Sequence, residues 1–536
     1  MQMTPGRKDC AVAIVGAGPV GLMAANLLGM AGVNVVVCEK SATLLGLPRA
    51  IAYEPETLRL FDQIGLYGEL APGLIPDPKI IYLNARGRRL MDMNPPRSLF
   101  GYSQIGTFYQ PELERILLNG LARFPQVEVC FGSEATGLAQ DGHGVELAIK
   151  TEAGGYVLHA QYVIGCDGGA SPTRAAIGSQ LVGSTFTERW LVVDTKIAGH
   201  DVKDITFFCD PRRPAVRVPA VGDRVRFEFM QLPGESTETL GSDAKLRELL
   251  APLVALDRVE IERKTVYAFH ARVADPWRRG LVFLAGDAAH MMPPFAGQGM
   301  NSGMRDAGNL AWKLAAVLRG AADAAILDTY EPERAPSVRT MVNLSRNLGA
   351  VIMPTRPMIA RLRDAIFAGV SRSRRADNFI RRGGILPKPE IGRSALSPGR
   401  RDGIAGAMLP QPVVSCGVES APLDRWIGYG RWCALGIGVD PTVNICPQDL
   451  VALRALDAAF LRLDPQGAAG ETGLRVDDGA FLDWVRRRNA QSLLVRPDRF
   501  IAERIVKGRP LRSLAALAPS VAGRRDHPVA KTLFAN

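Results

Sequence analysis

Residues 10–39, CAVAIVGAGPVGLMAANLLGMAGVNVVVCE, decide the fold of this chain. Residues 10–15 are apolar and predict a buried parallel strand, residues 19–30 predict a helix of small and apolar residues, and residues 34–38 predict the next strand. The uncharged run is long enough for a transmembrane helix, but a glycine turn interrupts it after the first strand. The stretch therefore predicts a βαβ unit, and we expect no membrane partner.

The glycine turn has the pattern G-x-G-x-x-G, which falls on Gly16, Gly18 and Gly21. In this pattern the first glycine permits a tight turn, the second lets a pyrophosphate approach the backbone, and the third lets helix and strand pack closely. Glu39 ends the second strand, where its carboxylate can accept hydrogen bonds from ribose hydroxyls. We expect an adenine dinucleotide here; the alternative is a glycine-rich turn of structural use only.

The composition is that of an ordinary globular protein of several domains, with 536 residues, 47% hydrophobic, 22% charged and a net charge of +11. The eight cysteines are scattered and form no C-x-x-C pair, so neither a disulfide framework nor a metal site is indicated, and a cytoplasmic location fits best. Residues 356–401 contribute +9 of the net charge. We interpret them as a solvated connector and expect no nucleic-acid partner.

Two distant segments bear on the identity of the dinucleotide, because each is a strand that ends in an acid. Residues 162–168 end in Asp167-Gly168, and residues 281–287 end in Gly286-Asp287. The second segment leads into the loop PPFAGQGMN (residues 293–301) and then into apolar residues with helical spacing up to Leu318. An acid at a strand end can bind ribityl or ribose hydroxyls, and the loop can lie along the edge of a ring.

These three motifs, in this order over residues 10–345, resemble the FAD-dependent aromatic hydroxylases, the single-component class A flavoprotein monooxygenases. A narrower resemblance, to hydroxylases of 3-(3-hydroxyphenyl)propionate, rests on residues 108–114, 209–214, 226–230 and 301–306.

The resemblance implies bound FAD and assigns it a set of contacts. Arg49 would lie near the phosphates and ribityl chain, or else be a surface arginine; Asp167 would lie near both FAD and the nicotinamide donor. The residues assigned to FAD are Gly16, Gly18, Gly21, Glu39, Arg49, Gln110, Asp167, Asp287, Gly297, Gly299, Met300 and Asn301. Independently of the family, the amino end of the helix after residue 301 would stabilise the anionic reduced flavin.

The family's chemistry further implies NADH or NADPH as a transient co-substrate, O2, and hydroxylation of a phenol through a flavin C4a-hydroperoxide. The catalytic candidates are Arg226, His270 and Pro294. Arg226 matches an arginine between the substrate sheet and the flavin, or else lies on the exposed face of a strand that alternates polar and apolar residues. His270 is an open candidate for a substrate contact, and His290 is expected to be structural or to lie beside the cofactor.

The expected fold class is α/β, α+β overall. The four parts expected are a discontinuous Rossmann-like FAD-binding domain of the glutathione-reductase type (1–175 and 279–345), an antiparallel substrate-binding sheet (176–278), a helical, Arg-rich connector (346–406) and a thioredoxin-like C-terminal domain (407–536).

Three functions remain open. The first is ortho-hydroxylation of a phenolic compound in aromatic catabolism, with 3-(3-hydroxyphenyl)propionate-like substrates as the example. The second uses the same flavin chemistry for ipso attack on a nitro- or halo-phenol or catechol, or for oxidation of a polycyclic phenol. The third is a non-catalytic FAD-binding protein. The expected partner is a small aromatic substrate, and a homodimer is left open.

Overall fold

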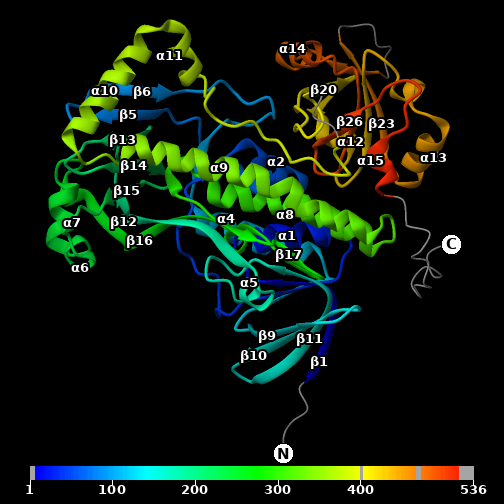
Figure 1. Ribbon diagram of the computed structural model, residues 1–536, viewed down its shortest axis with the longest axis horizontal. Helices are drawn as coiled ribbons and strands as arrows, with labels where there is room; N and C mark the ends of the chain where they lie inside the picture. Colours follow the sequence, from blue (N-terminus) through cyan, green and yellow to red (C-terminus); the bar gives the residue numbers. More distant parts are fainter. Residues whose placement is uncertain (1–5, 399–402, 466–472, 518–536) are drawn as a thin grey trace, which may run out of the picture.

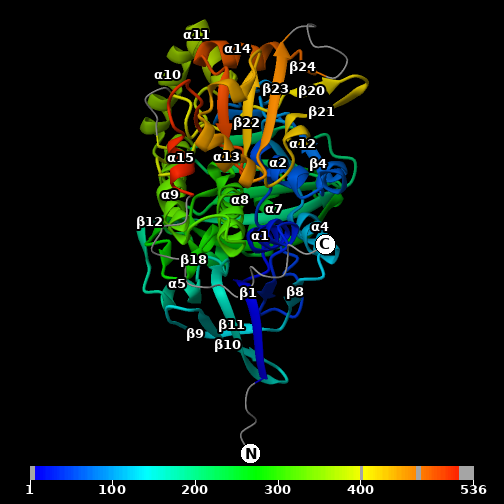
Figure 2. The ribbon, with the colours of Figure 1, turned by 90° about the vertical axis from the view of Figure 1, so that its right-hand side faces the viewer.

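Three large β-sheets and the helices around them make up the part of the chain that the computed structural model describes, residues 6–398, 403–465 and 473–517. Figure 1 shows the N-terminal sheet at the bottom, the green strands of the second sheet at the left, and the C-terminal unit in orange above the long helices. Figure 2 shows the C-terminal unit at the top of the molecule. The expected mixed α/β class is confirmed. Within the described residues, no helix is both long and apolar enough to cross a membrane.

The first sheet contains the predicted βαβ unit. Its central strands pair in parallel, and Val12, Ala13 and Ile14 are fully buried. Helix α1 contacts both α4 and α8. The strand order is β17 (Arg278–Arg279), β18 (Val282–Leu284), β11 (Gly154–Gly165), β1 (Gly6–Val15), β2 (Val35–Cys38) and β8 (Val127–Cys130), with β10 (Val145–Thr151) and β9 (Glu134–Gln140) paired onto β11. The helices are α1 (Pro19–Met30), α4 (Gln110–Gly120) and α8 (Gln298–Leu318).

The second sheet draws on more of the chain than the expected range 176–278. Strands β5 and β6 come from within the expected FAD-binding part, and β5 pairs in parallel with β13. Such pairing of segments far apart in the chain leaves no local signal, so the expected boundaries miss it. The strand order is β19 (His290–Met291), β16 (Val259–Asp275), β12 (Gln180–Ile197), β15 (Arg224–Met230), β14 (Ala215–Ala220), β13 (Ile205–Cys209), β5 (Ile80–Asn84) and β6 (Arg89–Met93).

Strand β15 is buried on both faces, although its alternation predicts a half-buried strand. Val225, Phe227 and Phe229 pack beneath α6 (Thr237–Leu240) and α7 (Asp243–Leu250) in one apolar cluster. Arg226 and Glu228, on the opposite face, are only 3% and 7% exposed. The alternation along β15 therefore separates an apolar face from a polar face, and both faces are buried. The alternative interpretation, that Arg226 lies on an exposed face of the strand, is wrong.

The third sheet forms the C-terminal unit and is mixed. Helix α13 (Pro447–Ala455) ends before Asp457, which has a positive φ of 52°, and strand β23 (Ala459–Pro465) follows. The order is β21 (Glu419–Pro422), β20 (Val413–Cys416), β24 (Leu474–Val476), β23 (Ala459–Pro465), β22 (Cys433–Ile437), β25 (Ser492–Val495) and β26 (Ile501–Arg504). Its helices are α12 (Leu423–Ile427), α13 (Pro447–Ala455), α14 (Gly479–Arg488) and α15 (Arg512–Ala515).

Buried ion pairs join the C-terminal unit to the rest of the molecule. Glu333 accepts hydrogen bonds from Arg496 at 2.8 Å and Lys313 at 2.7 Å, and none of the three side chains is exposed. Asp424 accepts two from Arg59, each at 2.7 Å. Such fully desolvated charges require one another, because removing one partner leaves a buried charge uncompensated. The C-terminal unit is therefore fixed to the helices that support the first sheet.

The remaining helices connect these layers. The basic segment 356–401 contributes α10 and α11, which lie at the outer end of the second sheet (Figure 1). The other elements are α2 (Pro55–Gln63), α3 (Tyr67–Leu70), α5 (Pro172–Ala176), α9 (Tyr330–Ile352), α10 (Pro357–Arg372), α11 (Arg374–Arg381) and a small sheet of β3 (Ala52–Tyr53), β7 (Gly106–Phe108) and β4 (Leu74–Pro76).

Candidate active site

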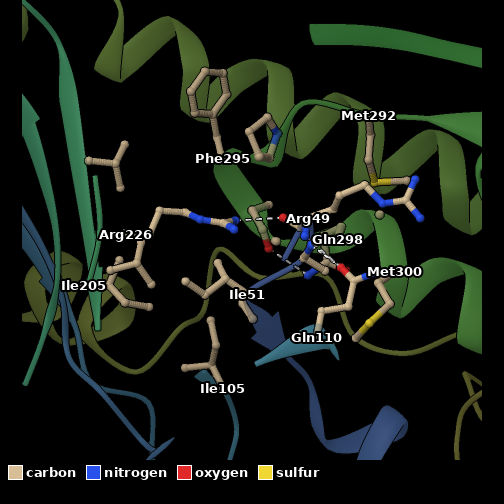
Figure 3. A pocket seen from close by; sticks show the side chains of 18 of the residues that line it. Arg49, Ile51, Ile105, Gln110, Ile205, Arg226, Met292, Phe295, Gln298 and Met300 are labelled. Carbon is tan, nitrogen blue, oxygen red and sulfur yellow. Dashed lines mark hydrogen bonds between the residues drawn. The ribbon is translucent and has the colours of Figure 1, made fainter. Parts of the chain in front are cut away.

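A cavity of about 300 Å³ lies where the carboxyl ends of the first sheet meet the second sheet. One half is lined by the predicted cofactor segments. The other half is roofed by the second sheet and is almost wholly apolar; Figure 3 shows Ile51, Ile105, Ile205 and Phe295 directed into it. The roofed half is lined by Ile51, Ile80, Tyr82, Met93, Ile105, Ile205, Phe207, Val216, Val218, Arg226, Glu228, Phe295, Leu348 and Leu386.

The three positions of the glycine turn require or favour glycine for different physical reasons. A Cβ on Gly16 would lie 2.5 Å from the Cys166 carbonyl oxygen, and one on Gly21 would lie 2.1 Å from the Gly16 carbonyl oxygen. Gly18 has an ordinary φ of −74° and nothing within 4 Å of a Cβ, and it lines the cavity. Protein packing therefore explains Gly16 and Gly21, whereas Gly18 leaves room for a ligand at the amino end of α1.

Glu39 lies at the end of β2, as predicted, and holds the glycine turn. Its Oε2 accepts a hydrogen bond from the Ala17 N–H at 2.9 Å, and its Oε1 accepts one from the Ser41 N–H at 2.9 Å. Each carboxylate oxygen keeps further acceptor capacity. The contact with a ribose stays a prediction.

Two acids at strand ends have acceptor atoms without a protein partner. Asp167 Oδ2 accepts from the Thr173 N–H at 2.9 Å, but its buried Oδ1 has no partner among the described residues. Asp287 lines the cavity and is exposed within a run of buried residues. Asp287 therefore offers vacant acceptors to a ligand rich in hydroxyl donors, whereas Asp167 does not itself line the cavity and lies between the lining residues Cys166 and Gly168. The contacts of both acids with FAD stay predictions.

The loop before α8 and the first turn of α8 contain both cavity-lining and positioning residues. Gly297, Gly299 and Met300 line the cavity, and Gly297 caps the helix with a φ of 64°. Asn301 is buried instead. Its Oδ1 accepts from Thr57 Oγ1 at 2.6 Å, and its Nδ2 donates to the Gly297 and Ala52 carbonyls at 2.8 and 3.1 Å. Asn301 therefore fixes the loop, while the positive amino end of α8 faces the cavity.

The segment around Arg49 is held from two sides (Figure 3). Gln110 Oε1 accepts hydrogen bonds from the N–H groups of Arg49 and Ala50, at 3.0 and 2.6 Å. On the other side, Arg226 donates to the Arg49 carbonyl at 2.8 Å and to the Pro48 carbonyl. The Arg49 side chain is exposed and lines the cavity. Arg226 thus links the second sheet to a cofactor segment.

Arg226 is also ion-paired. Its Nε donates to Asp194 Oδ1 at 2.7 Å, across the pair of strands β12 and β15. All three nitrogens of the guanidinium therefore have protein partners, and the side chain keeps one fixed direction.

The other catalytic candidates differ in position. Pro294 lines the cavity beside Phe295, and its catalytic role stays a prediction. The structure does not bring His270 to the cavity: it lies on the opposite face of β16 from buried Phe269, and its Nδ1 is 3.0 Å from Thr185 Oγ1. Because neighbouring residues of a strand point to opposite faces, the sequence alone did not fix the direction of the His270 side chain.

His290 is buried, and its contacts indicate a structural role. Its Nε2 is 2.6 Å from Asp306 Oδ2, and Asp306 also accepts from Arg334 at 2.9 Å and from the Gly286 N–H at 3.1 Å. Burial alone would raise the pKa of Asp306, but His290 and Arg334 hold it below its ordinary value. This charged group supports the loop that carries Asp287.

Sequence reasoning missed Glu228, the acidic side chain in the roofed half of the cavity. Burial raises the pKa of its carboxyl, and nearby Arg226 offsets only part of this effect. The available signal was the acid two residues after Arg226, on the same face of the strand.

Comparisons with known proteins agree with this geometry. The model of the FAD binding domain family matches residues 9–345, and the HcaD C-terminal domain model matches residues 406–519. A 3-(3-hydroxy-phenyl)propionate/3-hydroxycinnamic acid hydroxylase of Burkholderia vietnamiensis is 37% identical over 514 residues, which cover 92% of this chain and 94% of that protein.

Solved structures share the fold. The flavin-dependent monooxygenase PieE, in complex with FAD and substrate, superposes with a TM-score of 0.79 at 23% identity, covering 95% of this chain and 98% of its own. The p-nitrophenol 4-monooxygenase PnpA of Pseudomonas putida DLL-E4 has a TM-score of 0.64 at 27% identity, covering 70% and 97%. The chain therefore belongs to the FAD-dependent aromatic hydroxylases, the class A flavoprotein monooxygenases.

Proposed function

We propose that the protein hydroxylates a phenolic compound ortho to an existing hydroxyl, with O2 as the oxygen source and NADH or NADPH as the electron donor. The observation that carries the proposal is one cavity that joins the FAD segments to an apolar roof. The relatives named 3-(3-hydroxy-phenyl)propionate/3-hydroxycinnamic acid hydroxylases support substrates of that kind.

FAD, when bound, supplies hydride acceptance and oxygen activation. The chain supplies the surroundings. Gly18, Asp167 and Asp287 offer the space and acceptors for the dinucleotide, and the amino end of α8 offers positive charge for a reduced, anionic ring. The apolar roof excludes water around the reacting ring, which protects a reactive oxygen species from side reactions.

A second candidate reaction, ipso attack that expels nitrite or halide, has one specific observation in its favour. The p-nitrophenol 4-monooxygenase PnpA shares 27% identity with this chain. The two reactions differ in the released anion, so product analysis distinguishes them.

The test is a panel of phenols, nitrophenols and halophenols offered to the purified holoenzyme with NADH or NADPH. Oxygen uptake, hydroxylated product, hydrogen peroxide and released anion are measured together. Hydroxylated product in step with oxygen uptake supports the proposal. NAD(P)H oxidation that no compound stimulates would favour a non-catalytic FAD-binding protein instead. The homodimer stays a prediction, and light scattering of the holoenzyme tests it.

A further inference from the structure

Glu228 is a buried carboxyl in a cavity wall that, apart from Arg226 and Tyr82, is apolar. It is 7% exposed and lines the roofed half of the cavity. Its cross-strand neighbours are Val192 on β12 and Val216 on β14, both buried. Within the described part of the chain, no hydrogen-bond donor or ion-pair partner reaches its carboxyl. An unpaired buried carboxyl is costly, so its retention calls for a partner that the protein itself does not supply.

The nearest candidate partner is engaged elsewhere. Arg226 precedes Glu228 on the same face of β15, but its guanidinium bonds Asp194 and the carbonyls of Pro48 and Arg49. Asp194, beside it, is itself acidic and so cannot serve as a donor when ionised. The cavity therefore presents Glu228 as a hydrogen-bond acceptor to whatever occupies the roofed half.

We propose that Glu228 accepts a hydrogen bond from the phenolic hydroxyl already present on the substrate, and so orients the ring in the cavity. This inference rests on the proposed function. A hydroxyl donor supplies the partner that Glu228 lacks, and the apolar wall accommodates the ring. An anionic side chain on the substrate must then point away from Glu228, because like charges repel in a water-poor site. The substrate class is thus a phenol whose hydroxyl faces the second sheet.

The test compares ligands that differ only in the hydroxyl. Two pairs are titrated into the oxidised holoenzyme without NAD(P)H: 3-(3-hydroxyphenyl)propionate with 3-phenylpropionate, and 3-ethylphenol with ethylbenzene. Binding is followed by the perturbation of the flavin absorbance spectrum. In the unaltered protein we expect the hydroxylated member of at least one pair to bind about tenfold or more tightly, as a hydrogen bond to a charged group provides.

The variants Glu228→Leu and Glu228→Gln then separate recognition from structure. Glu228→Leu should reduce the preference for the hydroxylated ligand to about onefold, whereas Glu228→Gln, which keeps a carbonyl acceptor, should retain part of it. A merely structural residue would alter the affinity for both ligands of a pair alike. The matched control is Glu260→Gln, an exposed glutamate on β16 of the same sheet, which should bind like the unaltered protein.

Two results would overturn the inference: no preference for the hydroxylated member of either pair in the unaltered protein, or a preference that survives in Glu228→Leu. If Glu228→Leu fails to retain FAD, the Glu228→Gln titrations decide, since an undiminished preference in that variant also contradicts a charged acceptor. Because these titrations involve no turnover, their outcome is separate from that of the activity panel.

Discussion

Replacing Gly18 with alanine should weaken FAD binding without weakening the fold. A Cβ at this position meets nothing within 4 Å, and the backbone φ of −74° suits any residue. The unfolding free energy of the apoprotein should therefore change by no more than about 0.5 kcal/mol. The matched variant Gly21→Ala places its Cβ 2.1 Å from a backbone oxygen, and should lose roughly 2–3 kcal/mol.

The two variants should then differ in how FAD affects them. In Gly18→Ala the methyl group occupies the space where the pyrophosphate approaches the helix, and losing one charge-assisted hydrogen bond weakens binding about 10- to 100-fold. Each tenfold loss lowers the stability that saturating FAD adds by about 1.4 kcal/mol.

The assay is urea denaturation of apoprotein and holoprotein, with FAD titration by fluorescence quenching. The reasoning would be refuted if the Gly18→Ala variant bound FAD as tightly as the unaltered protein does. It would also be refuted if the Gly18→Ala apoprotein were as destabilised as the Gly21→Ala apoprotein. Gly299→Ala, which also meets nothing within 4 Å, provides a second example of the same behaviour at the amino end of α8.

Three further outcomes follow from the charged groups. Asp287→Ala should purify largely without yellow cofactor, measured by flavin absorbance per chain; full retention would contradict the assignment of Asp287 to FAD. Arg226→Met should lower the unfolding free energy by about 3 kcal/mol, measured by urea denaturation, because it leaves Asp194 buried without its main cation; an unchanged midpoint would contradict this. Although burial alone would raise the pKa of Glu333, Arg496 and Lys313 lower it, so its stabilising contribution is present above about pH 4.5 and is lost as the pH falls further. Glu333→Gln should therefore lose about 3 kcal/mol at neutral pH and show a shallower acid dependence in thermal unfolding; equal slopes in both proteins would contradict it.

Local patterns predicted the parts of the fold that local chemistry determines. The first βαβ unit is recognisable because each strand is buried on both faces, and because contacts with nearby backbone require a glycine at positions 16 and 21. The position of Asp287 in the cavity was also predictable. An acidic residue at the end of a buried strand rarely stabilises the fold, so its presence there favours a ligand contact. The family resemblance then supplied FAD and the aromatic substrate, which the glycine pattern alone could not distinguish from NAD.

What the sequence left open depends on contacts between distant segments. Strands β5 and β6 join the second sheet through pairing with β13, more than a hundred residues away. The alternation in β15 separates two faces but does not reveal that both are covered, so Arg226 remained ambiguous and Glu228 was overlooked. His270 lies on β16, none of whose residues lines the cavity, and the sequence did not show which strands of the second sheet form the roof.

The bond from Arg226 to the backbone at residues 48 and 49 has a consequence for protein engineering. The roof over the aromatic ring is not an interchangeable module, since one of its side chains holds the strip of backbone that presents Arg49. A chimera that takes its roof from another hydroxylase must bring an arginine at this place together with the acid that pairs with it. Without them, a new roof would also release the backbone that presents Arg49, and we expect weaker FAD binding.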